Sequence, residues 1–376
     1  MTRPGTVEPK RSCVYRRYPT LNAASIVWAA IAVSVAGFAL APVLLSHDVY
    51  SYVDYARLGV LHGLDPYLHP PAAAPADPAY AHVTWTEATS AYGPLFTLAT
   101  YPLAWLPVVT AVAALKASAA LSVLGTAVLV ARLAPARGVD PLRAAAFVAL
   151  NPLVLVHVVG GAHNDGSAML ATTIAVAATL SAREAGAGAA FVAAFVLKPP
   201  AALAAPFALA AALRSKHFPT RDGGKAAIGP GERAAARLLA GGGVAALAIG
   251  VGAYATFGWN WLDAIGLAGE NQHRTSHMSI PITTARLTGF DPTAVRTAAL
   301  GIYAVFVIYL LVRTWRGADW LRAAAWASLG LLLATAWLLP WYLIWALPLV
   351  ALSRDRPLQL LTLALTAYQL PARLPL

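Results

Sequence analysis

The feature that most constrains this chain is a block of about 20 apolar residues that recurs from Leu21 to the C-terminus. A helix can cross lipid because its own hydrogen bonds satisfy its backbone, and it needs roughly 20 apolar residues to do so. The chain is 59% hydrophobic and only 11% charged, whereas soluble domains carry about 25% charged residues. We therefore predict an all-α, polytopic transmembrane bundle. No stretch has the composition of a soluble domain, so residues 1–376 are predicted to form a single membrane domain.

Proline, glycine and charged clusters divide the apolar sequence into about eleven predicted spans. These are 21–45, 107–133, 144–159, 166–182, 186–198, 200–213, 235–257, 297–315, 321–339, 341–353 and 357–371. Residues 94–106 are apolar but short and contain two prolines, so they are predicted to dip into the membrane surface. On this topology, 46–106 is a first outer loop with surface helices, and 258–296 is a second outer loop.

The distribution of charge predicts an orientation. Most of the 27 Lys and Arg residues fall on the same side as the N-terminus, so the positive-inside rule places that side in the cytoplasm. The net charge of +11 is then explained by topology, and no nucleic-acid partner is needed. Most histidines fall on the other side, in the two outer loops and the turn near 160–166. The active face is therefore predicted to be outside.

Asp48 lies immediately after the first predicted span and is the leading candidate for a catalytic base. Apolar residues at Val49, Val53, Ala56 and Val60 predict a helix on the membrane surface. A carboxylate at this boundary is partly desolvated, which raises its pKa and makes it a better base. The alternative is a solvated cap at the start of that helix.

A glycine turn carries His163, Asn164 and Asp165 between two predicted spans. These side chains suit the orientation of hydroxyl groups, the holding of a phosphate through a cation, or the ligation of a hard metal. The alternative is an Asn-Asp turn that caps the next helix. Lys198 interrupts an apolar run, where a lysine is costly unless it has a partner such as a phosphate. The alternative is a lysine that reaches back to water.

The remaining candidates are aromatic or cationic residues. Arg274 in the second outer loop is a candidate phosphate clamp. Tyr92, Trp341 and Tyr342 suit stacking on sugar rings, although interfacial aromatic belts have the same composition. No histidine or carboxylate spacing is diagnostic of a metal site, so no metal ligand is assigned.

Several short motifs share the predicted outer face and follow one another along the chain. They are Asp48-Val49-Tyr50, Tyr92-Gly93-Pro94, Asn151-Pro152-Leu153 leading to His163-Asn164-Asp165, Lys198-Pro199, and Pro340-Trp341-Tyr342. Together they resemble the polyprenyl-phosphate-sugar-dependent glycosyltransferases of the GT-C superfamily. The pattern is most like the bacterial polyprenyl-phosphomannose-dependent alpha-1,6-mannosyltransferases, and the resemblance covers most of the chain.

The resemblance implies a GT-C-type helical bundle in the bacterial plasma (inner) membrane, with its cavity on the periplasmic side. It implies inverting transfer of a sugar, by analogy mannose, from a polyprenyl-phosphate donor to a glycan or glycolipid acceptor. Asp48 takes the place of the base, with Asp54 as the second choice. The residues assigned to substrate binding are Tyr52, Asp54, Arg57, Tyr92, His163, Asn164, Asp165, Lys198, His273, Arg274, Trp341 and Tyr342. Many members have two adjacent acids where this chain has His47-Asp48, so no cofactor is assigned and a divalent cation stays an open alternative.

Two other classes of function fit parts of the sequence. A lipid or glycan transporter or flippase would bind its substrate near the bilayer midplane, where the chain offers Lys116 and Lys198. A ligand at mid-depth would favour this reading. A noncatalytic assembly subunit would keep its full function in cells after both Asp48 and His163 are changed to alanine.

Overall fold

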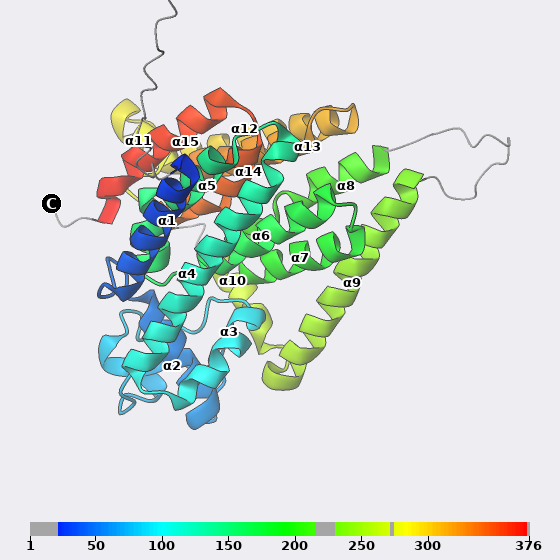
Figure 1. The fold of residues 1–376 in the computed structure, drawn as a ribbon. Coiled ribbons are helices and arrows are strands. Elements are labelled where there is room, and N and C mark those ends of the chain that lie inside the picture. The colour runs from blue at the N-terminus through cyan, green and yellow to red at the C-terminus, as the bar shows by residue number, and fades with distance from the viewer. Residues whose placement is uncertain (1–21, 215–229, 271–273, 374–376) are drawn as a thin grey trace, which may run out of the picture.

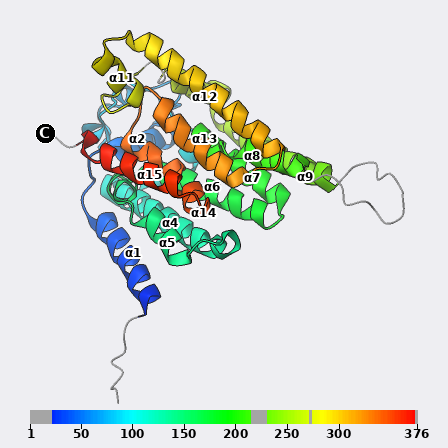
Figure 2. The same ribbon diagram turned by 90° about the horizontal axis from the view of Figure 1, so that it is seen from above.

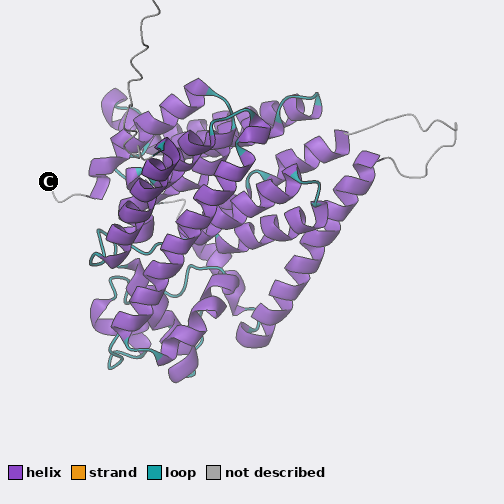
Figure 3. Cartoon of the chain, viewed as in Figure 1, coloured by secondary structure: helices purple, strands orange, loops and turns teal. Residues whose placement is uncertain are grey.

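The computed structural model describes residues 22–214, 230–270 and 274–373, and all regular secondary structure in these ranges is helical (Figures 1 and 3). The prediction of an all-α fold is thus confirmed. The helices are α1 (Ala23–Leu40), α2 (Asp48–Leu61), α3 (Pro94–Thr100), α4 (Val108–Leu133), α5 (Pro141–Ala149), α6 (Asp165–Leu180), α7 (Glu184–Leu197), α8 (Ala205–Arg214), α9 (Pro230–Phe257), α10 (Asp263–Glu270), α11 (Ile280–Thr288), α12 (Pro292–Trp315), α13 (Trp320–Ala334), α14 (Leu347–Leu352) and α15 (Arg356–Gln369).

The number of membrane spans is lower than predicted. Among the described residues, four helices are long and apolar enough to cross a membrane, namely α1, α4, α9 and α12. A fifth span is counted if α5 and the π-helix Val154–Gly160, bent by 61° relative to each other, cross together. The prediction of about eleven spans was therefore wrong. Segments such as 186–198 form helices of 14 residues, which are ~21 Å long and shorter than the ~30 Å hydrocarbon core.

Prolines explain why these apolar segments are short. Proline lacks the N–H that a helix interior needs, and it disfavours helical geometry in the residue before it. Lys198, which precedes Pro199, is extended at φ −155° and ψ 111°, and a 3₁₀ turn Pro199–Ala202 follows before α8. Pro340 likewise begins a 3₁₀ turn, Pro340–Trp345, ahead of α14. Both breaks place polar or aromatic side chains in the interior of the bundle.

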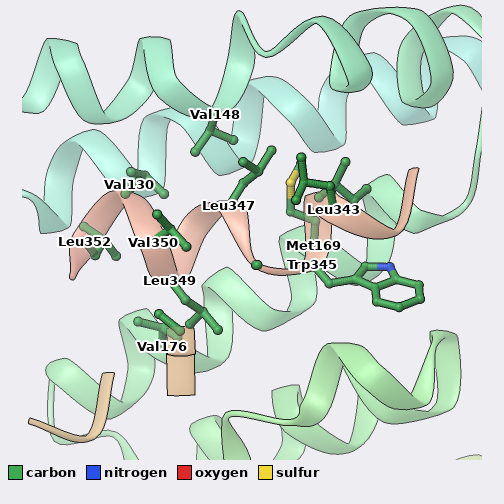
Figure 4. Close-up of a cluster of buried hydrophobic side chains, with 14 of the residues drawn as sticks. Val130, Val148, Met169, Val176, Leu343, Trp345, Leu347, Leu349, Val350 and Leu352 are labelled. Atoms are coloured by element: carbon green, nitrogen blue, oxygen red, sulfur yellow. The ribbon is translucent and has the colours of Figure 1, made fainter. Parts of the chain in front are cut away.

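The main core surrounds α14 (Figure 4). All six residues of this helix are buried, as expected for a helix that is apolar on every side. It packs against α4, α5, α6 and α13, where Val130, Val148 and Met169 are among the residues with no exposed surface.

The outer helices have a different surface. Figure 2 shows α1 and α12 on opposite edges of the bundle, and each exposes large apolar side chains such as Val33 and Ile302, both 72% exposed. Such a surface is unfavourable in water and suits contact with lipid. The chain is therefore a multi-pass membrane protein.

Helix α4 connects the two ends of the molecule (Figure 1). Near its start it packs against α2 through Val49, Val53, Val112 and Leu115. Beyond its last turn the chain reaches Arg137, which pairs with Asp319 at the start of α13. Arg322 of α13 in turn pairs with Asp355, which caps α15. One end of the bundle thus holds α2 and α3, and the other holds a set of arginine–aspartate pairs.

Candidate active site

Asp48 is the first residue of α2 and is reached from α1 through a tight turn. Leu45 in that turn has a φ of +56°, a left-handed conformation that is uncommon for any residue other than glycine. The Asp48 carboxyl group is 20% exposed, and its Oδ1 accepts a 3.4 Å hydrogen bond from the indole N–H of Trp85. The candidate base is therefore anchored by backbone geometry and still open on one side.

His163 faces Asp48 from the turn between the π-helix and α6. Its Nδ1 lies 3.7 Å from Oδ2 of Asp48, and its ring stacks on Trp341 at 4.1 Å between centroids. The preceding residue, Ala162, has a φ of +54°. At Gly161 a Cβ would lie only 2.6 Å from the His157 carbonyl oxygen. The turn is thus tightly packed, and it directs a buried imidazole at the candidate base.

Asp165, the first residue of α6, extends the cluster. Its side chain has no exposed surface. Oδ1 accepts a 2.9 Å hydrogen bond from the Trp345 indole, while Oδ2 lies 3.6 Å from Lys198 Nζ and 3.9 Å from His163 Nδ1. Two carboxylates therefore alternate with an imidazole and an ammonium group where burial strengthens their mutual attraction.

The partly exposed groups at the ends of this series define its accessible side. Asp48 and Lys198 are 20% and 22% exposed, whereas His163 and Asp165 are buried. A carboxylate can accept a proton from a hydroxyl group, and an ammonium group can stabilise a phosphate. Asp48 could therefore act as a base and Lys198 as a cation for a phosphate, with the buried His163 and Asp165 between them in the series.

The side chain of Asn164 is buried without a visible role in the fold. It occupies the N-cap position of α6 but makes no capping hydrogen bond. The residue is 3% exposed, and neither its amide nitrogen nor its amide oxygen bonds to another described residue. Buried amides are normally hydrogen-bonded. The alternative of a helix cap thus does not account for Asn164.

Tyr52 and Tyr92 lie beside the cluster. Tyr52 follows Asp48 by one helical turn, and its ring packs edge-on against Tyr92 at 4.7 Å. The ammonium group of Lys198 lies 5.5 Å from the centre of the Tyr92 ring. Burial, reinforced by the charge of Asp48, raises the pKa of both phenols well above 10. Both tyrosines therefore remain neutral and contribute packing and polarity.

The second outer loop reaches the site through Arg274. Its guanidinium group lies 5.5 Å from the centre of the Trp85 ring and 4.9 Å from that of Trp337. The hydroxyl group of Ser276 fixes this loop by donating a 2.8 Å hydrogen bond to the carbonyl of Leu338. Arg274 is thus separated from Asp48 by Trp85. His273 lies outside the described residues.

Asp54 and Arg57 point away from Asp48, although all three lie on α2. Successive residues of a helix are rotated by about 100°, so Asp48 and Tyr52 share a face that Asp54 and Arg57 do not. Arg57 is held by Asp77 at 2.8 Å and by the carbonyl of Ala104. Asp54 is 1% exposed. Burial, together with the charge of Asp77, raises the pKa of the Asp54 carboxyl to about 7.

Aromatic residues that were not assigned from the sequence complete the site. Trp345 bonds Asp165 and stacks at 4.4 Å on Tyr342, which had been assigned. Trp85 and Trp337 connect Asp48 to Arg274. The four-residue spacing of Trp341 and Trp345 next to Pro340 was the one sequence signal for this aromatic wall.

The acidic residues that the structure describes are not grouped as a metal centre. In the described parts of the chain, no three His, Cys, Asp or Glu side chains are grouped so as to hold a metal ion. Asp165 is already engaged by Lys198 and Trp345. The donor set at the site therefore does not fit a resident divalent cation.

Comparison with known protein families assigns the chain that carries this site to a family. The family described as alpha-(1->6)-mannopyranosyltransferase, N-terminal domain, matches residues 10–214, which include Asp48, His163, Asp165 and Lys198. The chain belongs to the alpha-(1->6)-mannopyranosyltransferase family. The resemblance drawn from the motifs is thus confirmed at the level of the family.

Two relatives show how far the similarity to this mannopyranosyltransferase family extends. The chain is 30% identical over 354 residues to alpha-(1->6)-mannopyranosyltransferase A of Mycobacterium tuberculosis, covering 88% of this chain and 65% of that protein. It is 29% identical over 169 residues to the protein of the same name from Corynebacterium glutamicum, covering 44% of this chain and 34% of that protein. The chain thus spans about two thirds of the length of the former. No solved structure matches it.

Proposed function

We propose that this protein is an inverting mannosyltransferase that uses a polyprenyl-phosphate-linked donor. It would transfer a mannosyl residue to a hydroxyl group of a glycan or glycolipid acceptor, in keeping with the names of its relatives. The observation that supports this proposal is the series Asp48–His163–Asp165–Lys198, whose two partly exposed ends are a carboxylate and an ammonium group.

Asp48 is the best candidate for the general base. Asp165 is fully buried and engaged by Lys198 and Trp345, and Asp54 lies on another face of α2. Only Asp48 among these three carboxylates combines exposure with contact to the site histidine. An acceptor hydroxyl group needs a base within hydrogen-bond reach, because its own pKa is high.

The reaction follows from the positions of the two ends of the series. The acceptor oxygen attacks the anomeric carbon of the donor while Asp48 takes the hydroxyl proton. The bond between that carbon and the phosphate oxygen breaks, and its electron pair leaves on the polyprenyl phosphate. Lys198 stabilises the charge that grows on the phosphate. His163 and Asp165 position Asp48 and Lys198.

Single displacement fixes the stereochemistry. An attack from the side opposite the leaving group inverts the anomeric carbon. An α-linked product therefore requires a β-linked donor phosphate. A donor of α configuration is not expected to be used.

The basic end of the bundle supports the proposed orientation. Arg137, Arg322 and their aspartate partners lie at the end opposite α2, and the positive-inside rule places such an end in the cytoplasm. We place Asp48 on the outer, periplasmic side of the bacterial plasma membrane, in one GT-C-type domain that carries both outer loops. A lipid-linked donor would reach this side from the bilayer.

A transporter or flippase is less well supported. Lys116, one of the two lysines that motivated it, donates hydrogen bonds to the carbonyl oxygens of Ala41 and Pro42 at the end of α1. These contacts give it a structural role. Sugar transfer by purified protein in detergent, where no second compartment exists, distinguishes an enzyme from a transporter.

The decisive experiment replaces Asp48 by asparagine. Purified Asp48→Asn protein should lose sugar transfer from a β-linked polyprenyl phosphomannose by a factor of at least about 10², with unchanged thermal melting. Glu87→Gln is the matched control, because Glu87 is an exposed acid of the same outer loop and should be neutral. Full activity of Asp48→Asn would place the base elsewhere.

A further inference from the structure

A cavity of about 280 Å³ opens at the end of the bundle opposite Asp48. Its wall begins at Gly138, a few residues beyond the end of α4. The helix that carries Asp48 packs near Val112 and Leu115, close to the start of α4. At 1.5 Å per residue, the cavity and Asp48 lie roughly 30 Å apart along this helix. The cavity is thus separate from the candidate active site.

Three arginines line this cavity. Arg143 comes from α5, and Arg354 and Arg356 come from the junction between α14 and α15. Arg143 donates a 3.3 Å hydrogen bond to Gln359. The guanidinium group of Arg354 lies over Gly138, where an added Cβ would be 3.1 Å from Nη1. Two of the three cations are therefore positioned by their surroundings.

The acids nearby are engaged with other groups. Asp140 accepts a 2.7 Å hydrogen bond from the backbone N–H of Arg143 as the cap of α5. Asp355 accepts bonds from Arg322, from Trp326 and from the N–H of Leu358. Within the described part of the chain, no carboxylate lies within 4.0 Å of the Arg143, Arg354 or Arg356 guanidinium groups. The cavity therefore has an excess of positive charge.

We propose that this cavity binds a phosphate ester. The planar guanidinium group offers paired N–H donors that match phosphate oxygens, and several such groups around one pocket are typical of phosphate recognition. Phe147 adds an apolar wall. Leu360, 67% exposed, follows Arg356 by four residues on the same face of α15. This neighbourhood suits the phosphate of an anionic phospholipid, and a soluble phosphate ester has the same recognition chemistry.

Native mass spectrometry of the full-length protein in detergent tests the proposal. The probes are phosphatidylglycerol, the zwitterionic phosphatidylcholine, and soluble glycerol 3-phosphate. We expect one of the two anionic probes to bind at least about tenfold more tightly than phosphatidylcholine. Binding of phosphatidylglycerol alone identifies a lipid headgroup as the source, and binding of glycerol 3-phosphate identifies a soluble ester. Failure of both anionic probes overturns the proposal.

Variants connect the binding to the cavity. The triple variant Arg143→Gln, Arg354→Gln, Arg356→Gln should weaken binding at least about tenfold, and the corresponding lysine triple variant should retain more of it. The matched control changes the exposed residues Arg132, Arg183 and Arg316 to glutamine, which removes the same charge outside the cavity. Equal losses in both glutamine triples would overturn the proposal. If the cavity triple does not fold, Arg356→Gln alone serves, because this side chain is exposed.

Discussion

The indole N–H of Trp345 donates a 2.9 Å hydrogen bond to Oδ1 of the fully buried Asp165. This bond engages one oxygen of the carboxylate, and the other oxygen, Oδ2, faces Lys198 and His163. A residue from the last third of the chain thus fixes the acid at the start of α6. The break at Pro340 makes this possible, because it turns the chain into the interior ahead of α14.

Trp345→Phe should therefore disturb the site as well as the fold. Loss of the donor leaves a buried carboxylate oxygen unsatisfied, which costs about 1–3 kcal/mol of stability. We expect kcat to fall with little change in the KM for the acceptor. The control is Trp326→Phe, which removes a 2.9 Å bond to Asp355 at the far end of the bundle. It should lower the melting temperature by no more than Trp345→Phe does, because Oδ2 of Asp355 keeps its bond from Arg322, and sugar transfer should be retained. Equal kinetic losses in both variants would contradict a positioning role.

Lys198→Gln should slow transfer by a factor of about 10²–10³, because the cation beside the leaving phosphate is lost. Lys198→Arg should recover part of the rate, because it keeps the charge. Initial rates with a polyprenyl-phosphate donor measure both effects, and thermal melting separates them from loss of the Asp165 ion pair. A rate that is unchanged in Lys198→Gln would restrict Lys198 to a structural role.

Asn164→Leu should separate stability from activity. Because the Asn164 amide is buried without a hydrogen bond to any described residue, an apolar side chain of similar shape should keep or raise the melting temperature. Transfer should fall if the amide binds a substrate hydroxyl group. Asn151 is the matched control, since its buried amide bonds to Thr366 and to the N–H of Leu153. Asn151→Leu should cost about 1–3 kcal/mol. Full activity of Asn164→Leu would contradict the binding role.

The buried carboxyl of Asp54 should make stability depend on pH. Its pKa rises from 3.8 to about 7 on folding, so the folded state holds the proton more tightly. The resulting stabilisation is complete below pH 3.8 and is lost as the pH rises through about 7. Asp54→Asn does not titrate, so its stability relative to the unaltered protein should increase from pH 4 to pH 8 by about 2–4 kcal/mol. Thermal melting across this range measures the difference, and a constant difference would contradict the prediction.

Gly93→Ala should destabilise the protein strongly. A Cβ at this position would lie 1.7 Å from the carbonyl oxygen of Val196, so α3 and α7 could not approach each other. Their close contact brings Tyr92 to Lys198. Gly186 in α7 has nothing within 4 Å of its added Cβ, and Gly186→Ala should stabilise the helix by about 1 kcal/mol. Thermal melting of the two variants checks the contrast, and similar melting temperatures would contradict it.

The sequence located the four long span helices, but it also counted shorter apolar helices as membrane spans. The apolar segments 107–133 and 297–315 became the long helices α4 and α12. The segments 186–198 and 341–353 became short helices beside proline breaks. Apolar composition reports burial, and it does not distinguish burial in lipid from burial within a bundle. The six buried residues of α14 illustrate the second case.

The part of the site that lies on α2 was predictable, because helix geometry alone decides which of its residues share a face. Asp48 and Tyr52 share a face of α2, and Asp54 and Arg57 do not, because of helical rotation. This rotation could have been applied to the sequence, and it separates the residues on α2 as the structure does. The partner of Arg57 is Asp77, and the charge of Asp77 also acts on Asp54. This placement of Asp77 depends on how the first outer loop packs, and no local sequence pattern predicts it.

Composition and periodicity by themselves determined that this chain is helical and lies in a membrane. Lipid offers no hydrogen-bond partners, so the backbone of an apolar block must satisfy its own N–H and C=O groups, as a helix does. The order of short motifs determined the family. Only the tertiary structure decided that Asp48, His163, Asp165 and Lys198 meet, and that Trp345 fixes one of them. These contacts join segments far apart in the chain. They are set by how kinked helices pack, an outcome of the whole bundle.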